Sequence, residues 1–137
     1  LYIYIHVIQE HNMIKVFFDG KCNLCSKEIN YYIKIAPSGI FDWQDINSLN
    51  DDYLNTGIKV SEALKILHVI DANNKLHLGI DAFIVIWNNL AYWKILAKVI
   101  SIPIIRQIAN IVYKKFANWR FNRLPHCILA KNNDDQI

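Results

Sequence analysis

The sequence predicts an α/β fold with a mixed sheet flanked by helices, and three observations lead to that prediction. Two short hydrophobic runs, at 14–18 and 40–43, enclose a segment with helical spacing, which is the pattern of a β-α-β unit with parallel strands. Two later runs, at 64–70 and 75–78, enclose four turn-forming residues, which is typical of a β-hairpin. Apolar residues at helical spacing fill most of the chain from residue 82 onward.

The first strand and the first helix carry the clearest local signals. The run IKVFF at 14–18 is β-branched and aromatic, and it stops at the turn Asp19-Gly20. From Cys22 the apolar residues recur every three or four positions until PSG at 37–39 ends the segment. The apolar face of the expected helix consists of Cys25, Ile29, Tyr32, Ile33 and Ala36.

The middle of the chain alternates short strands with polar segments. A second strand at 40–43 is expected to return parallel to the first, and a polar segment follows with a short helix expected around 47–55. The sequence DANN at 71–74 is the expected hairpin turn. Asp81 is expected to be the N-cap of a helix that starts at Ala82.

Three helices are expected in the remainder of the chain. Asn88-Asn89 breaks the first, and a second runs from about 92 to 100. Ser101 is the expected N-cap of the third, with Pro103 in its first turn and Leu124-Pro125 at its end. The apolar stripe of this third helix is Ile105, Ile108, Val112, Phe116 and Trp119.

Length and composition indicate a single domain at 13–130, with residues 1–12 as an extension outside the core fold and 131–137 as a frayed tail. The chain has 137 residues, of which 53% are hydrophobic and 20% charged, so it can bury one core. Three cysteines are too few for a disulfide-stapled secreted scaffold, which favours a reducing, cytoplasmic location.

Positive charge gathers in the second half of the chain. Residues 1–81 contain 7 Lys/Arg and 10 Asp/Glu, whereas residues 82–133 contain 8 Lys/Arg and no acidic residue. A basic and apolar half favours an acidic partner or a membrane surface, with a solvated basic face as the alternative. Lys94, Lys98 and Arg106 interrupt the apolar stretch, which argues against a membrane-spanning segment.

The pair Cys22 and Cys25 is the main candidate for chemistry. Cys22 lies where the helix begins, and the helix dipole and unpaired N–H groups there favour a thiolate. Cys25 is expected one turn further in and shielded, so Cys22 would attack a substrate disulfide and Cys25 would resolve the mixed disulfide. Asp19 is the nearest candidate to accept the proton of Cys25, and a turn or capping residue is its equal alternative.

Two other interpretations of the cysteine pair remain open. A zinc site would need two further ligands, from Cys127 or the adjacent His126 together with His68 or His77, and no second metal-binding motif supports it. Two inert buried thiols are the other alternative. The two histidines of the hairpin are expected to be strand residues without a catalytic role.

Basic and aromatic residues also alternate near the end of the chain. Arg120 and Arg123 are candidates to line an anionic site or to pair with a carboxylate such as Asp19, and surface charges at a helix end are the alternative. Nucleic-acid binding uses similar mixtures, but these aromatic residues follow the helical stripe and are more simply explained as core.

The segment FFDGKCNLCSKEINYYI resembles the signature of the DCC family of predicted thiol–disulfide oxidoreductases, which is named for its Asp and two Cys. The resemblance continues through ALKILHVIDANNKLHLGIDAFIVIW and VYKKFANWRFNRLPHC, and it covers about residues 14–127. It implies a thioredoxin-like fold and a redox pair with Asp19 as the signature Asp. Tyr113, Asn122 and Arg123 match the later motif without an assigned role.

Two departures from thioredoxin itself limit what the resemblance implies: without the proline, substrate docking differs or the dithiol chemistry is weaker, and with another dipeptide between the cysteines the reduction potential of thioredoxin does not carry over. The segment 60–64 has no proline where thioredoxins place a cis-proline, and Asn-Leu stands between the cysteines in place of Gly-Pro.

The sequence thus predicts a thiol–disulfide oxidoreductase that uses Cys22 and Cys25 with Asp19 as proton acceptor. No bound organic cofactor is expected, because the two sulfurs carry the electrons. The expected partners are a protein or small-molecule disulfide or thiol, a recycling reductant and, peripherally, a membrane or membrane protein. The alternative is a non-catalytic module that docks on an acidic partner or a membrane through the basic half.

Overall fold

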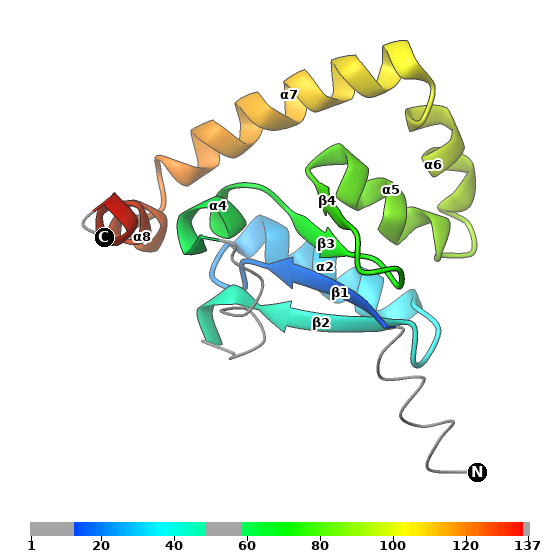
Figure 1. The fold of residues 1–137 in the computed structure, drawn as a ribbon, viewed down its shortest axis with the longest axis horizontal. Coiled ribbons are helices and arrows are strands. Elements are labelled where there is room, and N and C mark those ends of the chain that lie inside the picture. Colours follow the sequence, from blue (N-terminus) through cyan, green and yellow to red (C-terminus); the bar gives the residue numbers. More distant parts are fainter. Residues whose placement is uncertain (1–12, 49–58, 136–137) are drawn as a thin grey trace.

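The structure, a computed structural model, describes residues 13–48 and 59–135 (Figure 1). The expected N-terminal extension at 1–12 lies outside the described residues, as does most of the helix expected around 47–55. The strands are β1 (Ile14–Phe18), β2 (Phe41–Asp45), β3 (His68–Ile70) and β4 (Leu76–Leu78). The helices are α2 (Asn23–Ile35), the 3-10 helix η1 (Ile46–Ser48), α4 (Val60–Lys65), α5 (Ile80–Asn88), α6 (Lys94–Ile100), α7 (Pro103–Phe121) and α8 (Pro125–Asp135).

The four strands form one mixed sheet in the order β2-β1-β3-β4. β1 pairs with β2 in parallel, from Ile14 opposite Phe41 to Phe18 opposite Asp45. β3 pairs antiparallel with both β1 and β4, which confirms the β-α-β unit followed by a hairpin. This sheet with its flanking helices is consistent with the predicted α/β thioredoxin-like fold.

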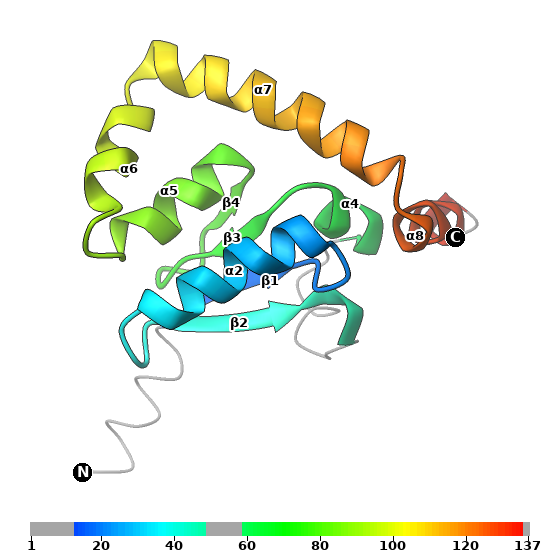
Figure 2. The same ribbon diagram turned by 180° about the vertical axis from the view of Figure 1, so that it is seen from behind.

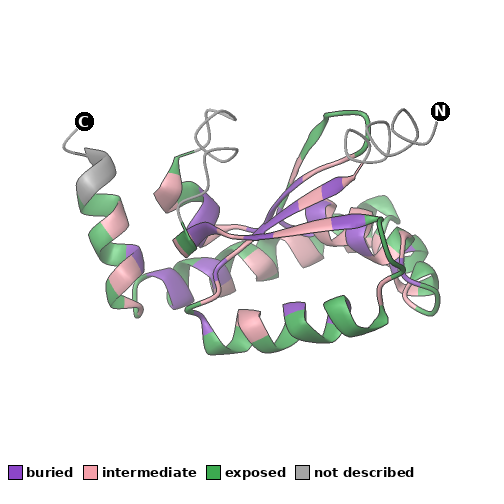
Figure 3. Ribbon diagram, turned by 90° about the horizontal axis from the view of Figure 1, so that it is seen from below, coloured by how far each residue is buried: buried purple, intermediate pink, exposed green. Residues whose placement is uncertain are grey.

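The alternation of side chains along β1 divides the core into two clusters on opposite faces of the sheet. Val16 belongs to the larger cluster, where Ile29 and Tyr32 of α2 meet Ile86 of α5. Phe17 belongs to the smaller cluster, which unites residues of η1, α4, α7 and α8. Figure 3 shows α2 with its exposed positions on the outer side and its buried positions toward the sheet.

The segment before β3 differs from the prediction. Leu64 and Lys65 belong to α4, so the first strand of the hairpin begins at His68 and not at residue 64. Ala63 and Leu64 are buried in the smaller cluster, which explains why a short amphipathic helix resembles an apolar strand in the sequence.

The two predicted helix N-caps, Asp81 and Ser101, also differ from what the structure shows. Gly79 is the N-cap of α5 with a φ of 59°, and Asp81 lies in the first turn, where it pairs with Arg106. Glycine suits this position because a residue with a Cβ is strained at positive φ. Ser101 belongs to the end of α6, where its hydroxyl donates to the carbonyl of Ala97, and α7 begins at Pro103.

The predicted apolar stripe of α7 is largely wrong. Ile108, Val112 and Trp119 are 58%, 62% and 55% exposed. The buried positions are instead Ala117, Arg120 and Phe121, because the inner face of this helix includes polar residues. The end of the chain differs as well, since α8 continues to residue 135 where a frayed tail was expected from 131.

No single helix within 13–48 and 59–135 is long and apolar enough to cross a membrane. Only α6 and α7 taken together reach that length and composition, and they are bent by 95° relative to each other.

Candidate active site

The turn after β1 places Asp19 at the carboxyl end of the sheet, beside the start of α2. The carbonyl of Asp19 accepts a hydrogen bond from the N–H of Cys22 at 3.2 Å. The N–H of Gly20 donates to Oδ1 of Asp45 at 3.0 Å. A Cβ at residue 20 would collide with the carboxylate of Asp45, so this close approach explains the glycine. Strand, turn and helix therefore hold Asp19 and Cys22 in a fixed relation.

Cys22 is the N-cap of α2. Its backbone is extended, with φ −83° and ψ 112°, and its Sγ accepts the N–H of Cys25 at 3.3 Å. Its carbonyl accepts the N–H of Ser26 at 2.8 Å, the first helical hydrogen bond. Cys22 thus stands at the start of the helix, as the sequence predicted, with its sulfur among the N–H groups of the first turn.

The burial of the two cysteines is the reverse of the expectation. Cys22 is 3% exposed, whereas Cys25 is half-buried and lines a cavity, so Cys25 is not the shielded thiol. α2 starts one residue after Cys22, and this directs the side chain of Cys25 toward the space between α2 and α7. Burial, followed by hydrogen bonding to Cys22, raises the pKa of Cys25 to about 12.

A cavity of about 70 Å³ adjoins Cys25 and is mostly apolar. It lies among β1, α2, α4, α5 and α7, and its polar groups include Asp19, Glu28 and Arg120. A small apolar space with a thiol and a few polar groups fits the general character of ligand sites in proteins.

Asp19 is a buried carboxylate with several donors. Its oxygens accept from Nδ2 of Asn47 at 2.8 Å and from the N–H of Lys21 at 3.0 Å, and they contact Nε2 of His126 at 2.8 Å. Burial alone would raise the pKa of this carboxyl, but the hydrogen bonds from Asn47 and His126 outweigh it and hold the pKa below its usual value. Asp19 is therefore ionised at neutral pH.

Arg120 connects α7 to Asp19 and to the end of α4. Its Nη1 lies 3.5 Å from Oδ2 of Asp19, and its Nη2 donates to the carbonyls of Leu64 and Lys65 at 2.6 and 2.9 Å. The pairing of Arg120 with Asp19 confirms one of the two predicted roles. Burial would lower the pKa of Arg120, but the nearby ionisable groups, Cys25 first and then Cys22, Tyr113 and Cys127, together outweigh it and raise that pKa.

Tyr113, Asn122 and Arg123, which match the later part of the family motif, differ in their exposure. The hydroxyl of Tyr113 accepts the N–H of Leu67 at 2.9 Å and so ties α7 to the residue before β3. Burial raises the pKa of Tyr113 to about 12, so it stays a neutral phenol. Arg123 is exposed and lies over the ring of Trp119 at 4.5 Å, and Asn122 is exposed just after α7.

His126 and Cys127 are the site residues for which sequence reasoning assigned no redox role. His126 contacts Asp19 from the first turn of α8, and Sγ of Cys127 lies 3.7 Å from Oδ2 of the same carboxylate. Cys127 is fully buried, and burial followed by the charge of Asp19 raises its pKa to about 12. Pro125 is predicted from the sequence to end the preceding helix, whereas a proline is also favoured in the first turn of a helix, and this local signal could have indicated α8.

The zinc alternative does not gain support from this arrangement. In the described ranges, the ligand atoms that lie within 4.8 Å of one another belong to Asp19, His126 and Cys127, a group without the C-x-x-C pair. The guanidinium of Arg120 beside Asp19 would repel a dication there. His68 and His77 lie in β3 and β4, as predicted for strand residues.

The mixed sheet with its flanking helices and the close pair of Cys22 and Cys25 are consistent with a thioredoxin-like fold. The chain belongs to the DCC1-like thiol-disulfide oxidoreductase family, whose model matches residues 16–124. An uncharacterized chloroplastic protein of Arabidopsis thaliana is 25% identical over 111 residues, which are 78% of this chain and 50% of that protein. The chain thus spans about half the length of this relative, and no solved structure matches it.

Asp19→Asn is expected to destabilise the protein by about 3 kcal/mol at pH 7, because the buried Arg120 loses its charged partner. The folded-state pKa of Asp19 lies below the usual value of 3.8. The ionised carboxylate therefore makes its full contribution to the free energy of unfolding at pH values above 3.8. The contribution is lost as the pH falls through the folded-state pKa. Urea unfolding of both proteins across pH 2–7 should therefore show the two stabilities converging in acid.

Asp81→Asn is the control for this measurement. Asp81 pairs with Arg106 at 2.7 Å on the surface, where both side chains are well exposed, so its loss should cost less than about 1 kcal/mol. Equal costs for the two variants at pH 7 would contradict the stabilising role of the buried pair.

Proposed function

We propose that the protein catalyses thiol–disulfide exchange with Cys22 and Cys25 as the redox couple. The observation that carries this proposal is the Sγ of Cys22 at the N-cap of α2, which accepts the N–H of Cys25 at 3.3 Å. The positive charge of Arg120 acts electrostatically on both sulfurs. Membership of an oxidoreductase family supports the same chemistry.

In the proposed reaction the thiolate of Cys22 attacks one sulfur of a substrate disulfide. A new S–S bond forms to Cys22, the substrate S–S bond breaks, and its other sulfur leaves as a thiolate. Cys25 then loses its proton and attacks Sγ of Cys22, which releases the second substrate thiolate and leaves a Cys22–Cys25 disulfide. Two electrons pass from the protein to the substrate, and a thiol reductant returns them.

The pKa of Cys25 is expected to fall at the step where this thiol must act. Part of its elevation comes from hydrogen bonding to Cys22 and from the charge of that sulfur. Both contributions end when Cys22 is bonded to substrate. Asp19, which is ionised and lines the same cavity, is the proposed proton acceptor. Because its pKa is low, Asp19 releases the proton again to solvent and serves as a relay.

The cavity beside Cys25 is the proposed route by which substrate approaches the buried Cys22. Its mostly apolar lining suits a disulfide or thiol, in a protein or a small molecule, with an apolar group next to the sulfur. The three free cysteines suit a reducing compartment such as the cytoplasm, which we include in the proposal.

Cys25→Ser is expected to accumulate a mixed disulfide with substrate on Cys22, because the resolving thiol is missing. Cys22→Ser should abolish both exchange and trapping. Non-reducing gels with peptide mass mapping identify the trapped cysteine, and Cys127→Ser is the control that should retain exchange. A substrate trapped on Cys25 in the Cys22→Ser protein, with none trapped on Cys22 in Cys25→Ser, would reverse the assigned order.

Asp19→Asn should slow resolution of the mixed disulfide by about 100-fold at pH 7 and leave the first attack less affected. Rapid-quench measurements of mixed-disulfide formation and decay separate the two steps. Asp45→Asn is the matched control, because Asp45 holds the same turn through Gly20 and does not line the cavity. If Asp45→Asn slows decay as much, Asp19 has only a structural role.

A further inference from the structure

The outward face of α7 is apolar over most of its length. Ile104, Ile108, Ile111, Val112 and Trp119 are between 55% and 71% exposed. At 1.5 Å per residue this 19-residue helix is about 28 Å long. A row of exposed apolar side chains along most of such a helix marks an interaction surface in a folded protein.

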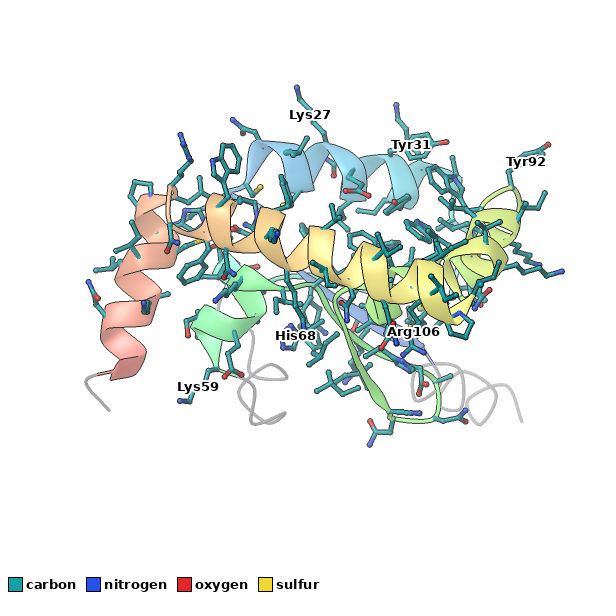
Figure 4. All side chains as sticks on the ribbon, turned by 90° about the horizontal axis from the view of Figure 1, so that it is seen from above. Lys27, Tyr31, Lys59, His68, Tyr92 and Arg106 are labelled. Atoms are coloured by element: carbon teal, nitrogen blue, oxygen red, sulfur yellow. The ribbon has the colours of Figure 1, made fainter. Side chains whose placement is uncertain are left out.

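The opposite face of α7 contacts the rest of the fold. Tyr113 bonds the residue before β3, and Arg120 bonds the end of α4 and Asp19. In Figure 4, viewed from above, α7 crosses the front of the molecule, and none of the described strands or helices passes over it. Figures 1 and 2 show the same helix along the outer edge of the fold. The aliphatic residues of this face therefore point away from the core, while the ring of Trp119 contacts Phe116 and Arg123.

Cations accompany this apolar face. Lys114 and Lys115 are exposed on α7, and Arg123 lies over the exposed ring of Trp119. α6, which bends by 95° from α7, adds exposed Lys94 and Lys98. The sequence from 82 to 133 contains no acidic residue that would neutralise them.

We propose that the outward face of α7 docks the protein on an anionic lipid bilayer, with the helix parallel to the membrane plane. The bilayer offers an apolar layer beneath a layer of negative charge, which matches aliphatic side chains and Trp119 surrounded by lysines and arginine. Neither α6 nor α7 alone is both long and apolar enough to span, and the two helices are bent by 95° relative to each other, which agrees with a position on the surface. The dithiol site lies on the other side of α7, so docking leaves it open to substrate.

Charge argues against a second copy of the chain as the occupant. Two such faces brought together would place lysines opposite lysines in an apolar contact, which is unfavourable. An acidic protein partner would satisfy the charges, but the exposed side chains are spread along a single convex helix and do not enclose a groove for a complementary segment.

Co-sedimentation of the full chain with phosphatidylcholine vesicles, with and without phosphatidylglycerol, tests this proposal. Binding is expected only to the anionic vesicles and should weaken with salt. Lys114→Glu with Lys115→Glu should reduce binding about tenfold or more. Lys27→Glu with Lys34→Glu on α2 makes the same change in net charge away from the face and should leave binding nearly unchanged.

Two further double variants test how much the apolar side chains contribute to vesicle binding. Ile108→Ser with Val112→Ser should weaken binding to anionic vesicles about tenfold, whereas Ile33→Ser with Ile35→Ser on α2 should not. All four proteins should keep the circular dichroism and the thiol exchange of the wild type. Equal binding to neutral vesicles, equal losses in the α2 controls, or self-association through α7 would each overturn the proposal.

Discussion

The buried carboxylate of Asp19 is the constraint on which the rest of the site depends. It stands at the end of β1, and the groups that keep it ionised come from η1, α7 and α8. A buried charge is stable only when it is paired and hydrogen-bonded, so these distant elements must assemble before the carboxylate can be buried. The turn that begins at Asp19 also fixes Cys22 at the N-cap of α2. The burial of the Asp19 carboxylate therefore links the packing of η1, α7 and α8 to the position of Cys22.

α7 links this site to the rest of the molecule. Arg120 reaches Asp19 and the end of α4, while Tyr113 holds Leu67, the residue before β3. These contacts use the inner face of the helix and so leave its aliphatic face outward. A helix that must position a buried arginine and a tyrosine turns its polar residues inward, which explains its inverted pattern of burial.

Local patterns predicted the parts of the fold that local chemistry determines. The β-α-β unit, the hairpin turn at 71–74 and the helix start at Cys22 follow from spacing and turn residues. The inner face of α7 was not predicted, because the partners that bury Arg120 lie between 55 and 101 residues earlier in the chain. The contact between His126 and Asp19 joins residues 107 apart and leaves no periodic signal. The relative burial of Cys22 and Cys25 likewise depends on long-range packing.

A redox titration of the purified protein in thiol/disulfide buffers tests the central claim most directly, with alkylation and mass spectrometry to identify each cysteine. We expect a single reversible two-electron transition that joins Cys22 to Cys25 and leaves Cys127 reduced at every potential. Cysteines that stay reduced under all oxidising conditions, or a disulfide that includes Cys127, would contradict it.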